Sequence, residues 1–156
     1  MKQNSKFNFL RFYVETRYAI GFSECPIRGF GAQPIPKFLQ KVAKYYGISI
    51  ERDSRLGYDQ AVHLVWSPSN LRQIVLGDFL DEERELLAFF HELGHELAKR
   101  LTVKHRYLNK QAVEGIAWEL GLDAAYRFGF EWEEGDPALQ WAINCFNSYY
   151  VDPSSS

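Results

Sequence analysis

The sequence predicts a single α+β domain, and three features of the chain support that class. Three long segments, at 85–100, 110–129 and 136–150, carry apolar residues at helical spacing. Before them come three short runs rich in β-branched residues, which are typical of strands. The length of 156 residues is enough to bury one core without disulfides. We therefore expect a small antiparallel β-sheet packed on helices, in one domain over residues 1–156.

Residues 1–35 are expected to form an irregular, aromatic-rich N-terminal segment. They contain many Phe, Tyr and Gly residues without a clean period, and the stretch RGFGAQPIP indicates a loop at their end. The stretch PKFLQKVAKYYG then places apolar side chains at helical spacing. Pro36 in the first turn and Gly47 at the end predict a short amphipathic helix between them.

Three runs then predict strands: ISIERD at 48–53, AVHLVW at 61–66 and RQIVLGDF at 72–79. The turn-forming residues 67–70 join the last two runs and predict a hairpin over residues 61–77. The strand at 72–77 leads into the next helix, so its end should lie near that helix. As the later strand of the hairpin, it is expected to keep one edge free for an extended peptide. Coverage of that edge by the aromatic N-terminal segment is the alternative.

Three helices complete the expected fold. Asp81 can cap the first, which runs through ELLAFFHELGHELAKR and ends in cationic residues. The second spans KQAVEGIAWELGLDAAYRFG, with Gly129 as its stop. The third is DPALQWAINCFNSYY, before a short polar tail. No internal repeat or interdomain linker separates them.

Charge and hydropathy exclude several classes of partner. The chain has 18 Lys and Arg against 20 Asp and Glu, with no basic stripe, so no direct contact with nucleic acid is expected. No run reaches the 18 or so apolar residues of a membrane span, and the N-terminus lacks the apolar run of a signal peptide. We expect no membrane partner and a cytoplasmic location.

The stretch HELGH places His91, Glu92 and His95 within five positions. A His-Glu-x-x-His match arises by chance in about 0.8% of chains of this composition. Residues four apart lie one above the other on a helix, so both imidazoles can reach one Zn²⁺ ion. Glu92 is turned by roughly 100° from His91, where a carboxylate can act as a general base. The alternative is two ordinary histidines on an amphipathic helix.

A catalytic zinc needs a third protein ligand, and four downstream residues are candidates. Glu114 lies inside the apolar arc of its helix, whereas Glu119 and Asp123 lie on the solvated side. A carboxylate in an apolar arc requires a positive partner, and a metal ion is the strongest one in view. We therefore predict Glu114 as the ligand, with a buried salt bridge to an arginine as the alternative. His105, in a loop, is the weaker candidate.

An oxyanion donor cannot be read from the spacing, but three residues are candidates for that role or for contact with substrate. They are His63, His105 and Tyr107. Each of these residue types is more often a packing or surface residue than a catalytic one.

From Pro36 to Gly129 the chain resembles the ImmA/IrrE-type zinc metallopeptidases and, more broadly, the gluzincins. The stretch IVLGDFLDEERELLAFFHELGH is similar to that family's strand, acid-rich link and motif helix. In AVEGIAWEL, Glu114 matches the family's ligand glutamate, while Gly115, Ile116 and Trp118 depart from its Ala, Asn and Phe. The resemblance implies a minimal zincin-like domain, with the sheet packed on the motif helix and on a second helix that bears a ligand.

The expected function is that of a zinc-dependent endopeptidase acting on a protein or peptide. His91, His95 and Glu114 would hold Zn²⁺, which lowers the pKa of water, and Glu92 would take the proton. The resemblance implies a helix-turn-helix repressor of a mobile element or stress regulon as substrate. A catalytically silent zincin-fold module that binds protein is the main alternative, although it would not need Glu92. A helical binding protein without metal is the third.

Overall fold

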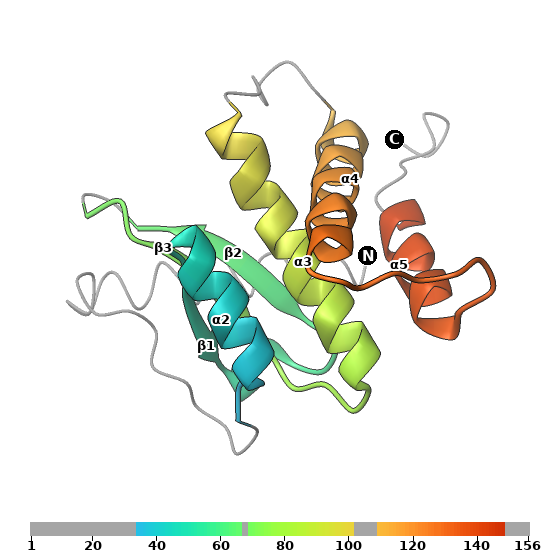
Figure 1. The fold of residues 1–156 in the computed structure, drawn as a ribbon, viewed down its shortest axis with the longest axis horizontal. Helices are drawn as coiled ribbons and strands as arrows, with labels where there is room; N and C mark the ends of the chain where they lie inside the picture. Colours follow the sequence, from blue (N-terminus) through green and yellow to red (C-terminus); the bar gives the residue numbers. More distant parts are fainter. Residues whose placement is uncertain (1–33, 67–68, 102–108, 149–156) are drawn as a thin grey trace.

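The computed structural model describes residues 34–66, 69–101 and 109–148, which form an α+β fold of four α-helices and one three-stranded sheet (Figure 1). The α+β class expected from the sequence is thus confirmed. The strands are β1 (Ser49–Arg52), β2 (Ala61–Val65) and β3 (Arg72–Leu76). The helices are α2 (Lys37–Tyr46), α3 (Glu82–Arg100), α4 (Lys110–Arg127) and α5 (Pro137–Asn147), with a 3₁₀ turn η1 (Ser54–Leu56) after β1.

The sheet is mixed, which corrects the expectation of an antiparallel one. Its strand order is β1-β3-β2; β2 and β3 form the expected antiparallel hairpin, but β1 pairs with β3 in parallel. The chain reverses its direction between β1 and β2 and reverses it again in the hairpin. Strand β3 therefore runs in the same direction as β1, and it lies between β1 and β2. Since β3 is the central strand, the free edge expected on it is wrong. Among the described residues, β2 is paired on one side only.

The helix boundaries follow the residues that cap them. Gly47 ends α2 in the left-handed region, at φ 69°, where L side chains are disfavoured. The Asp81 carboxylate accepts a hydrogen bond from the Glu83 backbone N–H and starts α3 as expected. Asn109 and Asp136 cap α4 and α5 in the same way. These caps fix where the helices begin, and the two longest, α3 and α4, pack against each other.

The main core lies between the sheet and helices α2 and α3. It includes Leu39 and Val42 of α2, Ile74 of β3, and Phe89 and Leu93 of α3, which are all nearly or fully buried. Helix α4 packs along α3 and runs antiparallel to it, and α5 packs against α3 beyond the sheet (Figure 1). The motif segment of α3 is therefore fixed by the core on one side and by α4 on another.

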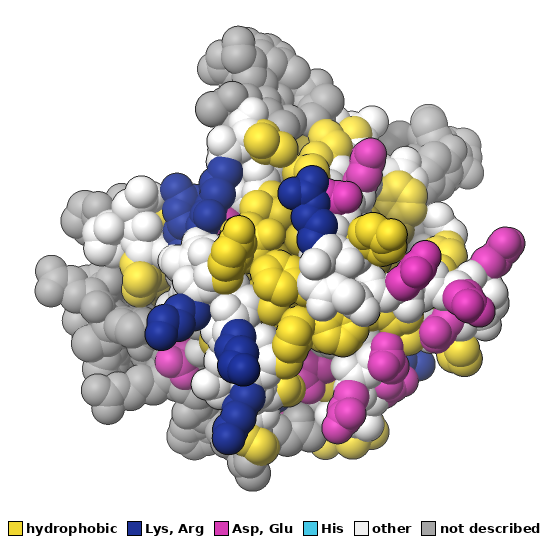
Figure 2. All heavy atoms as spheres, in the orientation of Figure 1, with side chains coloured by type: hydrophobic (Ala, Val, Ile, Leu, Met, Phe, Trp, Pro, Cys, Tyr) yellow, Lys and Arg dark blue, Asp and Glu magenta, His cyan; other side chains and the backbone are white. Residues whose placement is uncertain are grey.

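The face shown in Figure 2 carries apolar side chains between Lys and Arg on one side and Asp and Glu on the other. No described histidine is visible on this face, so the histidine cluster of α3 does not open onto it. No α-helix in the described ranges has the length and apolar content needed to cross a membrane. The expectations for residues 1–33 and for the 67–68 part of the turn lie outside the described residues.

Candidate metal centre

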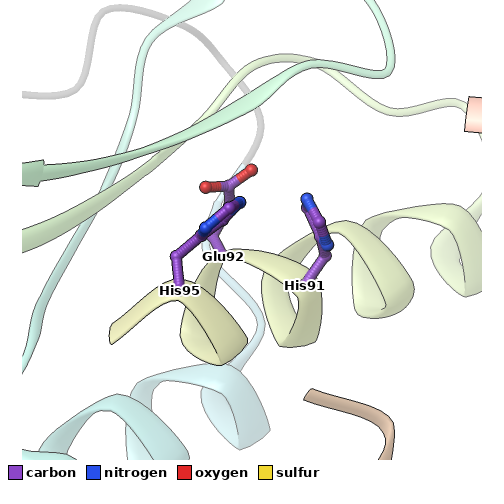
Figure 3. Close-up of side chains that lie close together, drawn as sticks. All are labelled: His91, Glu92 and His95. Atoms are coloured by element: carbon purple, nitrogen blue, oxygen red, sulfur yellow. The ribbon is translucent and has the colours of Figure 1, made fainter. Parts of the chain in front are cut away.

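Helix α3 presents three side chains of the motif on the same side (Figure 3). The ligand atoms of His91, Glu92 and His95 lie within 4.8 Å of one another, close enough to hold a metal ion. His91 is buried, while His95 and Glu92 keep some exposed surface. The arrangement follows from the helical period, which returns every fourth residue to the same face.

Glu114 of α4 closes the group from the opposite helix. Its Oε2 lies 2.8 Å from His91 Nε2 and 3.2 Å from His95 Nε2. Glu114 is 9% exposed, whereas Glu119 and Asp123 on the same helix are exposed, as the apolar arc predicts. Among the described residues, Glu114 forms ion pairs with the two histidines. The alternative, a buried salt bridge between Glu114 and an arginine, is not observed among these residues.

Two glycines allow α4 to approach α3 closely enough for this contact. A Cβ at Gly94 would lie 1.8 Å from the carbonyl oxygen of Ala117. A Cβ at Gly121 would lie 2.1 Å from the carbonyl oxygen of Phe90. Because glycine has no Cβ, the two backbones come together at both points. The glycine inside the HELGH motif thus sets the distance that Glu114 must span.

The charges of the cluster influence each other. Burial opposes ionisation of Glu114, but the bonds to His91 and His95 outweigh it and lower the pKa of Glu114 to about 2. Burial also opposes a charge on His95, yet its bond to Glu114 and the nearby Glu92 raise the pKa of His95. Burial raises the pKa of Glu92. Glu114 is therefore an anion aimed at two imidazole nitrogens, as a metal ligand must be.

His91 is held by stacking, a feature that the motif did not reveal. Its ring lies 4.2 Å from the ring of Trp118 with an interplanar angle of 29°. The Nδ1 atom of His91 and the Nε1 atom of Trp118 are both buried and find no hydrogen-bond partner among the described residues. Histidine ligands usually donate this second nitrogen to an acceptor. In this protein the stacked indole ring of Trp118 restricts the orientation of the His91 imidazole.

His63, a candidate oxyanion donor, lies on β2 with its side chain 6% exposed. Its Nε2 atom is 2.9 Å from Oε1 of Glu96, a fully buried acid one turn after Glu92. Arg72 and Arg100 also donate to Glu96, at 2.8 Å and 2.7 Å. The Nε2 atom of His63 is thus hydrogen-bonded to Glu96. The role of His63 as an oxyanion donor stays an untested prediction. Sequence reasoning did not single out Glu96.

The backbone of His63, by contrast, faces the candidate base. In the hairpin, Trp66 N–H donates to Leu71 O and Gly77 N–H donates to Gln60 O, so even-numbered residues of this strand bond to β3. Antiparallel pairs alternate, and the N–H of His63 must point away from β3. This N–H lowers the pKa of Glu92 by a hydrogen bond, against the larger effect of burial. The outer edge of β2 therefore lies beside Glu92.

His105 and Tyr107 lie outside the described residues, so their placement near the cluster stays a prediction. Comparisons with models of known protein families, with curated proteins and with solved structures give no match to this chain.

Proposed function

We propose that this protein is a zinc-dependent endopeptidase that hydrolyses peptide bonds of a protein substrate. The observation that carries the proposal is the convergence of Glu114 on both histidines of the motif, with Glu92 beside them. Two histidines and a glutamate are the ligand set of a class of catalytic zinc sites, in which a fourth position stays open. A structural site would bring four protein ligands and would leave no task for Glu92.

The donor atoms fit a zinc ion by type and by separation. Ligand atoms around a tetrahedral zinc with bonds of 2.0–2.1 Å lie about 3.3 Å apart. The Glu114 oxygen lies 2.8 Å and 3.2 Å from the two imidazole nitrogens, so small side-chain rotations suffice. When bound, the metal would supply Lewis acidity and lower the pKa of a water molecule to about 7.

Glu92 would act as the general base and then as the acid. Its carboxylate is on the same side of α3 as the two histidines, and its ligand atom lies within 4.8 Å of theirs. Burial raises its pKa towards the range in which a carboxylate takes a proton from water and returns it to a leaving amine. The His63 backbone N–H holds one face of this carboxylate.

A peptide substrate would bind along the outer edge of β2 and not along β3. Gln60 and Trp66 form backbone hydrogen bonds across the hairpin, so the odd-numbered residues between them direct their N–H and C=O groups outward. These residues are Ala61, His63 and Val65. An extended peptide added there would form backbone hydrogen bonds next to Glu92. Because backbone bonds carry little sequence information, selectivity would come from side-chain contacts. A helix-turn-helix repressor is the substrate class implied by the resemblance to the ImmA/IrrE-type peptidases.

The test compares the wild-type protein with Glu92→Gln, using Glu119→Gln as a control at an exposed carboxylate of α4. Each protein is incubated with a mixture of quenched fluorescent peptides of random sequence, and bound zinc is measured in parallel. We expect Glu92→Gln to keep its zinc and its folding while losing cleavage, because an amide cannot accept the proton. Glu119→Gln should behave as wild type.

The same comparison separates the endopeptidase from a catalytically silent binding module. Cleavage by Glu92→Gln at the wild-type rate would exclude the proposed mechanism. A wild-type protein that binds zinc and captures a protein but cleaves neither that protein nor any peptide would favour the silent module. Protein captured by Glu92→Gln should be cut when wild-type enzyme is added.

A further inference from the structure

A second buried acid on α3 lies one turn after the candidate base and is held from three directions. Glu96 is 0% exposed, and its Oε1 accepts from His63 of β2 and from Arg72 of β3. Its Oε2 accepts from Arg100 at the end of α3. Three side-chain donors thus converge on its two carboxylate oxygens, and two of these donors are guanidinium groups. Glu96 therefore ties both strands of the hairpin to the motif helix.

The two arginines already neutralise Glu96, so the bond from His63 is not needed to balance its charge. One carboxylate between two guanidinium groups leaves a net charge of +1, and a protonated histidine would increase it. Burial lowers the pKa of His63 to about 4, and the ring is therefore neutral near pH 7. A neutral imidazole at 2.9 Å must donate its Nε2–H to the carboxylate. What this bond fixes is the position of residue 63.

His63 joins two successive acids of α3 by two different groups. Its ring bonds Glu96, and its backbone N–H, which points away from β3 on the outer edge of β2, forms the hydrogen bond that acts on the pKa of Glu92. The two acids are four residues apart, so they lie on the same side of the helix. A strand that is anchored at Glu96 through a side chain is therefore held in register at Glu92 through its backbone.

We propose that His63 and Glu96 form a positioning clamp, which holds the outer edge of β2 against the general base Glu92. Neither side chain touches the reacting atoms in this proposal. The clamp rests on the proposed function for the role of Glu92, but its geometry can be measured without any substrate. Loss of the clamp should free the amide of residue 63 and misplace the Glu92 carboxylate, while leaving the ligands His91, His95 and Glu114 in place.

The test measures amide hydrogen exchange by NMR in the full-length, zinc-loaded protein. The amide of residue 63 is compared with those of Ala61 and Val65, which share the outer edge. In wild type, residue 63 should be protected more than its two neighbours. Glu92→Ala should remove that extra protection, by about tenfold in exchange rate if one typical hydrogen bond is lost. This variant leaves the hairpin residues unchanged and so controls for folding.

Two matched substitutions then test the ring. His63→Gln can place a donor near the position of Nε2, whereas His63→Asn carries its donor nearer the backbone and falls short of Glu96. We expect Asn to abolish the extra protection and Gln to restore most of it. Arg100→Gln, which removes another bond to Glu96, should leave protection at residue 63 nearly unchanged. Zinc content should be that of wild type throughout.

The kinetic readout follows the same pattern. On quenched peptides, His63→Asn should lower kcat about tenfold with a smaller change in KM, and His63→Gln should recover it. Equal protection at residue 63 in wild type, Glu92→Ala and His63→Asn would overturn the clamp. Protection that behaves as expected in a protein that cleaves no peptide would instead count against the proposed function and leave the clamp standing.

Discussion

The close approach of α3 and α4 can be tested by adding one methyl group at Gly94. The new Cβ would lie 1.8 Å from the Ala117 carbonyl oxygen, whereas real contacts of this kind stay above about 3 Å. The helices must therefore separate by about 1 Å, and such overpacking typically costs 1–3 kcal/mol. The better helix propensity of alanine offsets up to about 1 kcal/mol of this loss. We expect Gly94→Ala to lower the free energy of unfolding by about 1–2 kcal/mol.

The same displacement moves Glu114 away from the histidines. A shift of about 1 Å is large beside its distances of 2.8 Å and 3.2 Å from His91 and His95. Misplacing a group that orients or binds a metal typically lowers affinity by 10–100-fold. Zinc affinity, measured by titration against a competing chelator, should fall within that range, and urea unfolding should give the loss of stability.

Gly115→Ala is the matched control, because it also adds a methyl group to a helical glycine near the site. A Cβ at Gly115 would meet only the Phe146 ring, at 3.4 Å, which is an ordinary contact. This variant should be as stable as wild type or more stable, by up to about 1 kcal/mol. If Gly94→Ala is as stable as Gly115→Ala and binds zinc equally well, the two helices do not meet through Gly94 and the reasoning is wrong.

Three further predictions concern the metal, the pH dependence and the substrate edge. Glu114→Ala should lower zinc occupancy far more than Glu119→Ala or Asp123→Ala, by elemental analysis; equal losses would show that the third ligand is misassigned. Since the pKa of buried His63 is lowered from 6.5 to about 4, the unfolded chain binds this proton more readily, and stability should fall between pH 6.5 and 4. The loss approaches about 3 kcal/mol at most, and urea unfolding of wild type should show a steeper fall than His63→Gln does. Val65→Pro, which removes an outward N–H of β2, should weaken peptide binding more than Val65→Thr does in folded, zinc-loaded protein, and equal binding would place the substrate elsewhere.

The order of helices and strands could be predicted because each has a local signal. Helical spacing, the Asp81 cap and the Gly47 stop all lie within a few residues of the elements they define. The buried position of Glu114 was also readable, since its place in an apolar arc depends only on the helical period. These features follow from short-range geometry.

The sheet order was not readable, because it depends on contacts between residues far apart in the chain. Nothing local in β1 states that it pairs in parallel with β3, and this pairing is what makes β2 the edge strand. The roles of Glu96 and Trp118 were hidden for a related reason. From the sequence alone, a glutamate on a helix is expected to be a solvated charge. Glu96 is buried because Arg72 and His63 of the sheet pair with it. Such partners are fixed by the tertiary fold.

Helix α3 distributes the six residues 91–96 among three neighbours, and this explains why the motif is compact. With about 100° per residue, His91, Gly94 and His95 fall within one arc of about 100° and face α4. Glu92 and Glu96 fall on the adjacent arc, towards β2, and Leu93 falls opposite and is 0% exposed in the core. The proposed ligands and the proposed base must therefore lie side by side, with Glu92 nearer the strand edge. An ordinary amphipathic helix needs one apolar face and one solvated face, whereas this segment requires a close helix contact, a buried acid and a core residue within two turns.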